Sequence, residues 1–129
     1  MSARRCVGPA DHEAIDTAPK APLAICVADS FLGRLRGLHG LPTVPPGMVR
    51  ALILRPCRAV HTLGLRGPID VVFLGADNRI LRHVSALPPN RWAIERRARA
   101  VVELPAGYCS GSSWSAALSR TLLDSKIIT

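Results

Sequence analysis

The chain has 129 residues, a formal net charge of +8 and 48% hydrophobic residues, a composition that excludes a disordered protein. A domain of this length buries enough apolar surface to fold without cross-links, and no apolar run approaches the roughly 18 residues that cross a bilayer. The start, MSARRCVGPADHEAIDTAPK, has no apolar stretch after its basic residues, so we expect no secretory signal and a cytoplasmic protein.

Arginine carries most of the positive charge. It supplies 15 of the 17 basic residues, and between residues 30 and 120 there are 13 arginines and 4 acids, a net charge of +9. Such a field favours acidic partners or polyanions, although most charge on a small domain is solvated surface. The four cysteines include no C-x-x-C pair, so without an export signal we expect free thiols.

The first third of the chain predicts a tail, a strand and a short helix. Residues 1–20 are polar and aperiodic, which indicates a flexible tail. Residues 23–28 alternate apolar side chains at period two, the pattern of a strand. Residues 29–40 combine N-capping side chains with apolar residues at helical spacing, and this predicts about two helical turns. A proline-rich loop follows over residues 41–47.

The rest of the chain predicts a sheet and a second helix. Residues 71–74 are apolar on both faces, which predicts a central strand that is covered on both sides. The predicted second helix is amphipathic, with Trp114, Leu118 and Leu122 on one side. We expect further strands over residues 49–54, 80–87 and 98–104, with a turn at 75–78. The fold class is therefore α+β: a small, largely antiparallel sheet or partly closed barrel with short flanking helices.

Four blocks of sequence occur in a recognisable order and spacing: RLRGLHG (34–40), PPG (45–47), LILRPCRAVHTLGLRGPIDVVFLGADNRIL (52–81) and VVELPAG (101–107). Together they resemble the bacterial and archaeal family called domain of unknown function 192 (DUF192). We therefore expect residues 21–107 to form a DUF192-like domain and residues 108–129 to form a divergent C-terminal segment with a short helix. The resemblance implies a small barrel-like β-rich fold but no activity, cofactor or catalytic residue. Some relatives lie beside genes for tight-adherence pili or secretion.

Cys57, His61 and Asp70 are the candidate catalytic residues. If residues 66–68 turn the chain, the segments of His61 and Asp70 run antiparallel, and a diagonal carboxylate can orient the imidazole as an acid–base pair. Cys57 as nucleophile completes a Cys-His-Asp arrangement. This pattern gives one hypothesis, an enzyme of unknown substrate. The alternative is that these side chains make structural hydrogen bonds beside a turn.

Cys57 and His61 also have the spacing of half a metal site. Residues four apart on an extended strand are about 13 Å from each other, which is too far to share one zinc ion. No second pair of ligands lies nearby in the sequence. We therefore expect no metal and no cofactor.

A non-enzymatic binding or accessory module is the leading hypothesis. It would contact a protein or small ligand, neither of which the sequence identifies, and the oligomeric state is also open. Two charged residues that end apolar elements, Arg36 and Glu103, form either a buried ion pair or a small anionic-ligand site. The candidate binding residues are His61, Thr62, Arg66, Asp70, Arg36 and Glu103.

Nucleic-acid binding through an Arg-rich surface is a third hypothesis. The densest basic cluster runs from Arg91-Trp92 through residues 95–99, and an aromatic ring beside arginines can stack on a base. The chain is poor in aromatic residues, at 4%, and it matches no RNA-binding motif. We therefore interpret residues 91–99 as a solvated loop that leads into a strand.

Overall fold

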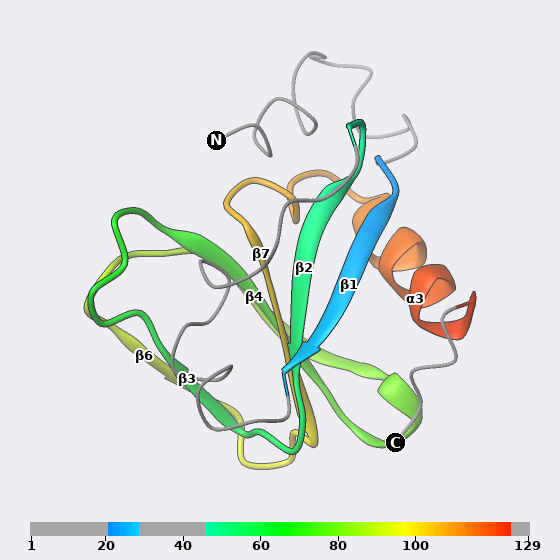
Figure 1. Cartoon of the computed structure of the whole chain (residues 1–129). Helices are drawn as coiled ribbons and strands as arrows, with labels where there is room; N and C mark the ends of the chain where they lie inside the picture. The colour runs from blue at the N-terminus through cyan, green and yellow to red at the C-terminus, as the bar shows by residue number, and fades with distance from the viewer. Residues whose placement is uncertain (1–20, 29–45, 125–129) are drawn as a thin grey trace.

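The computed structural model describes residues 21–28 and 46–124 (Figure 1). The predicted tail, the helix predicted over residues 29–40 and most of the proline-rich loop lie outside these residues. Within them the structure has helix α3 (Trp114–Asp124) and a 3-10 turn, η4 (Ala76–Asn78). The strands are β1 (Leu23–Ala28), β2 (Val49–Leu54), β3 (Ala59–His61), β4 (Ile69–Leu74), β5 (Ile80–Leu87), β6 (Trp92–Ile94) and β7 (Ala100–Pro105).

Five of these strands form an open sheet in the order β1-β2-β7-β4-β5. Strand β1 is parallel to β2, whereas the other neighbours are antiparallel. Strands β3 and β6 pair with each other in a separate antiparallel sheet, which we call the ribbon. The predicted α+β class with a largely antiparallel sheet is confirmed. Of the two alternatives, the structure has the open sheet, since β1 and β5 end the strand order and no barrel closes within residues 21–28 and 46–124.

The central strands of the sheet are apolar on both faces. Every residue of β4 and of β7 is buried, as predicted for residues 71–74. Alternation along β4 divides the core into two clusters: Val72 and Leu74 belong to one, and Val71 and Phe73 to the other. Because both faces carry buried side chains, each face of the sheet needs its own cover.

Helix α3 covers one face. Its buried residues are Trp114, Leu118 and Leu122, the three that helical spacing predicts. They join the cluster that contains Val72 and Leu74 of β4. The segment between β7 and α3 contributes two further buried residues to this cluster, Tyr108 and Cys109, so it is an integral part of the core.

The ribbon covers the other face. Val60 and Ala93, the middle residues of its two strands, are 5% and 8% exposed and pack in the cluster that contains Phe73. Figure 1 shows the ribbon to one side of the five-stranded sheet, on the left of the view. The interpretation of residues 91–99 as a loop is wrong for Trp92–Ile94, which form β6. Three residues between charged neighbours are too few to show a period in the sequence.

The expected antiparallel pairing of the His61 and Asp70 segments is also wrong. Strand β3 pairs with β6, whereas β4 pairs with β5 on one side and β7 on the other. Because β4 already has a neighbour on each side, it offers no edge to β3. Residues 62–68 consequently form a loop, which bends where Gly64 has a φ of 80°.

The packing of α3 predicts a contrast between two leucines of that helix. Leu118 is 0% exposed, whereas Leu123 is 68% exposed. We expect Leu118→Ala to lower the free energy of unfolding by about 2–5 kcal/mol, because it leaves a cavity under the helix. Leu123→Ala should stay within about 0.5 kcal/mol of the wild type. Urea unfolding of both variants measures this, and equal losses would contradict the described position of α3.

Candidate functional site

Asp70 is completely buried, at 0% exposure, and both of its carboxylate oxygens are bonded. Oδ1 accepts a hydrogen bond from the backbone N–H of Ala86 at 2.8 Å, and Oδ2 accepts one from the backbone N–H of Cys109 at 2.8 Å. Ala86 lies in the irregular part of β5 with a φ of 51°. The carboxylate therefore joins β4 to β5 and to the segment that leads into α3, and such charge-assisted bonds are strong.

His61 and Cys57 make their own separate contacts. His61 is half-buried, and its Nδ1 accepts a hydrogen bond from the backbone N–H of Leu63 at 3.3 Å. Its ring lies 5.1 Å from the ring of Trp92, centroid to centroid, at 52°. The half-buried Cys57 donates from Sγ to the backbone carbonyl of Ala59 at 3.0 Å. These hydrogen bonds of Cys57, His61 and Asp70 thus lead to backbone groups, not to one another.

Thr62 fixes the end of the ribbon. It is 0% exposed, its Oγ1 donates to the carbonyl of Pro88 at 2.6 Å, and the same oxygen accepts from the backbone N–H of Arg91 at 2.8 Å. Its backbone N–H donates to the carbonyl of Arg91, and its carbonyl accepts from the N–H of Asn90, each at 2.9 Å. Thr62 therefore ties the loop after β3 to the loop before β6.

Arg82 of β5 fixes the ribbon from the side of the sheet. Its guanidinium lies 5.0 Å from the centre of the Phe73 ring and donates to the carbonyl of Ile94 at 2.8 Å. It also approaches Glu95 at 3.5 Å, and Arg97 approaches the same carboxylate at 3.4 Å. The pKa of Glu95 lies below its usual value, chiefly because its carboxylate accepts a hydrogen bond from the backbone of Arg97, with both guanidinium groups adding to the effect.

The outer face of the ribbon is apolar and exposed. His61 lies directly opposite Trp92 in the register of β3 and β6, so the two side chains share one face. Trp92 is 60% exposed, Ile94 of the same strand is 57% exposed, and Leu63 beside His61 is 49% exposed. We call His61, Leu63, Trp92 and Ile94 the ribbon face. Sequence reasoning missed Leu63 and Ile94, because their exposure depends on the unrecognised pairing of β3 with β6.

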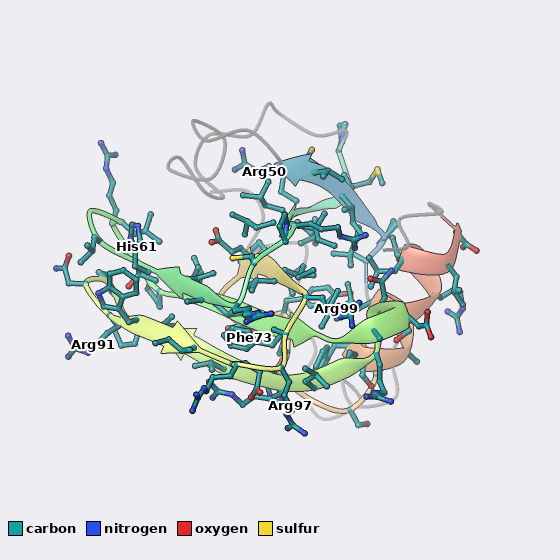
Figure 2. The ribbon with its side chains drawn as sticks, turned by 90° about the horizontal axis from the view of Figure 1, so that it is seen from below. Arg50, His61, Phe73, Arg91, Arg97 and Arg99 are labelled. Carbon is teal, nitrogen blue, oxygen red and sulfur yellow. The ribbon has the colours of Figure 1, made fainter. Side chains whose placement is uncertain are left out.

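Arginines are frequent in the two segments that form the ribbon and its loops. Residues 57–68 and 88–97 contain five arginines and a single acid, Glu95, and Glu95 is already engaged by Arg82 and Arg97. All five side chains are exposed; they are Arg58, Arg66, Arg91, Arg96 and Arg97. In Figure 2, Arg91 is labelled beside His61 at the far end of the ribbon from Arg97. The ribbon and its loops thus combine exposed apolar side chains with exposed cationic ones.

The remaining predicted binding residues lie elsewhere. Glu103 is 5% exposed on β7, opposite Leu52 of β2 and Val71 of β4, on the side of the sheet that the ribbon covers. Arg36 falls outside the described residues, so its predicted pairing with Glu103 stays a prediction.

Among residues 21–28 and 46–124, no three His, Cys, Asp or Glu side chains gather closely enough to hold a metal ion. Within the same residues, no helix is long and apolar enough to span a membrane.

Residues 13–115 match the model of the DUF192 family, described as an uncharacterized ACR. The fold resembles a protein of unknown function from Novosphingobium aromaticivorans, with a TM-score of 0.52, 18% identity and coverage of 64% of this chain and 63% of that one. It also resembles a protein from Sinorhizobium meliloti that is provisionally described as a transcription regulator, with a TM-score of 0.52, 22% identity and coverage of 66% and 70%. A comparison with curated proteins gives no significant match.

These likenesses to solved structures concern the fold alone, because the identities are only 18% and 22%. The matched region spans less than two thirds of the Novosphingobium chain. What either protein binds is therefore no guide to the surface described above.

The contacts of Asp70 predict a structural role for this carboxylate. Asp70→Asn replaces one acceptor oxygen with an N–H₂ group that faces a backbone N–H, so we expect a loss of about 3 kcal/mol in the free energy of unfolding. Asp124→Asn, at the exposed end of α3, removes the same charge and should change the stability by less than about 0.5 kcal/mol. Thermal or urea unfolding compares the two, and a wild-type stability for Asp70→Asn would refute the assigned bonds.

Proposed function

Because the chain belongs to the DUF192 family, which supplies no activity, we propose from its geometry that it is a non-enzymatic binding module. The ribbon face is its contact surface, and the partner is a protein with an apolar centre and an acidic rim. The observation that carries this proposal is the exposure of Trp92 and Ile94 on the outer side of β6, with Leu63 exposed in the loop that follows β3.

Clusters of exposed large apolar side chains are uncommon on monomeric proteins and mark sites that bind another molecule. Five large hydrophobic residues of the described chain are strongly exposed, and three of them belong to β6 or to the loop that follows β3. Tryptophan and arginine are the residues most often found to dominate the affinity of protein interfaces. Trp92 with Arg91 beside it has this composition.

The face is also held in place before any partner arrives. Thr62 bonds to both loops at one end of the ribbon, and Arg82 bonds to the backbone of β6 at its side. The ring of His61 packs against Trp92, which limits the rotamers of the indole. A surface ordered in advance loses less conformational entropy on binding.

The arginines of the ribbon and its loops select the charge of the partner. The ribbon segments carry five arginines, and their one acid, Glu95, is bonded to Arg82 and Arg97. An acidic rim on the partner would complement this field and speed association. By resemblance, a component of a pilus or secretion apparatus is one class of protein that such a module would serve.

The enzyme hypothesis has weaker support. Cys57, His61 and Asp70 each bond to a different backbone group, and Asp70 is wholly buried. Nucleic-acid binding is the second candidate, because Trp92 is exposed beside Arg91 and bases stack on such rings. The two exposed aliphatic side chains, Ile94 and Leu63, favour a protein over a base as the occupant.

Selection of binding peptides tests the proposal. A random peptide library displayed on phage is passed over the immobilised full chain, and we expect enriched peptides that place Asp or Glu next to aliphatic or aromatic residues. Ile94→Ala should weaken these peptides about tenfold, because it removes a contact at the centre of the face. Emission of Trp92 reports binding, since the second tryptophan, Trp114, is only 7% exposed.

Leu123→Ala is the matched control, because Leu123 is also strongly exposed, at 68%, but lies on α3. It should leave the affinity of the selected peptides unchanged. The proposal fails if no peptide is enriched over the naive library, or if both alanine variants weaken binding equally. Preferential binding of a single-stranded oligonucleotide, with the steep salt dependence of phosphate contacts, would favour the second candidate instead.

A further inference from the structure

A second cationic surface lies at the end of the five-stranded sheet, apart from the ribbon face. Arg99 directly precedes β7, and Arg79 directly precedes β5. Ala100 and Ile80, the residues that follow them, are both register partners of Leu74 in β4. The two arginines therefore flank the end of β4, and their backbones are about 10 Å apart, twice the spacing of neighbouring strands.

Hydrogen bonds hold both arginines in the sheet. The backbone N–H of Arg99 donates to the carbonyl of Leu74 at 2.7 Å, and its carbonyl accepts from the N–H of Cys57 at 3.2 Å. The carbonyl of Arg79 accepts from the N–H of Gly75 at 2.7 Å. The backbones of these two residues are thus fixed on each side of β4.

Arg55 braces the turn that carries Arg79. It follows β2, and its Nη2 donates to Oδ1 of Asn78 at 3.0 Å, within η4. Asn78 is 8% exposed and has a φ of 58°, so this bond stabilises a backbone conformation that most residues avoid. Burial lowers the pKa of Arg55, and a bound anion would favour its charged form.

The side chains of Arg79 and Arg99 lie on the same side of the sheet. Ala100 and Ile80 both pack in the cluster that α3 covers, and each arginine directly precedes one of them. Alternation along the extended backbone therefore directs both guanidinium groups to the opposite side, the one that the ribbon covers. Both residues are exposed, and neither makes an ion pair within the described part of the chain.

We propose that Arg79 and Arg99 bind a small ligand that carries a diphosphate group, with Arg55 as a positioning residue. Guanidinium groups bind phosphate oxygens with two parallel hydrogen bonds, and two adjacent phosphates give each arginine an oxyanion. The η4 turn also carries one acid, Asp77. Together with Arg55, Arg79 and Arg99 it gives this end of the sheet a net charge of +2. The site does not depend on the proposed role of the ribbon face.

Titration of the full chain with inorganic pyrophosphate, followed by the backbone amide signals in NMR spectra at constant ionic strength, tests the site. We expect saturable shifts centred on Gly75, Arg79 and Arg99. Arg79→Gln and Arg99→Gln should each weaken the affinity about tenfold, the loss expected for one charged hydrogen bond. Thermal unfolding of each variant shows that the fold is kept.

Arg91→Gln is the control, because it removes the same charge at the far end of the ribbon (Figure 2). It should leave the pyrophosphate affinity within twofold of the wild type, and Trp92→Ala should do the same, which separates this site from the ribbon face. Shifts that do not saturate, or an equal loss in Arg91→Gln, would overturn the proposal by showing a general response to charge. A single-stranded oligonucleotide that binds through Arg79 and Arg99 while pyrophosphate does not would overturn it as well.

Discussion

The structure depends on one constraint: the central strands β4 and β7 are buried on both faces. A sheet with two apolar faces needs two covers, and helix α3 supplies one of them through Trp114, Leu118 and Leu122. The ribbon is the second cover of this sheet. Its inner residues, Val60 and Ala93, pack in the core beneath it. Because side chains alternate along a strand, their neighbours lie on the outer face of the ribbon.

The surfaces proposed for binding follow from this arrangement. A two-stranded ribbon that covers a core with one face turns the other to solvent, and here that face carries Trp92 and Ile94. Thr62 and Arg82 hold the ribbon against the sheet through bonds to its backbone and loops, so the exposed face has a fixed shape. The ends of β4, β5 and β7 are fixed in the same way by strand pairing, which places Arg79 and Arg99 on either side of one strand.

Local patterns in the sequence predicted the parts of the fold that depend on local periodicity. The apolar run at Val71–Leu74 predicted a buried central strand, and helical spacing predicted the buried side of α3. The ribbon was not predictable in this way, because Trp92–Ile94 is too short to show a period and pairs with β3 across 30 residues of sequence. The role of Thr62 was not predictable for a similar reason, because the partners of its hydroxyl lie 26 and 29 residues away in the sequence. The sequence pointed to Asp70, but its partners at Ala86 and Cys109 became visible only in the folded chain.

The ribbon is a rigid cover, and its outer face is formed before any partner binds. Amide hydrogen exchange of the free protein measures this rigidity at the N–H of Arg91, which donates to Oγ1 of Thr62. We expect this amide to be strongly protected in the wild type, and Thr62→Val to remove its protection while the amides of β4 and β7 keep theirs. If the Arg91 amide of the wild type exchanges at the rate of an exposed loop, the ribbon is not held in place before binding.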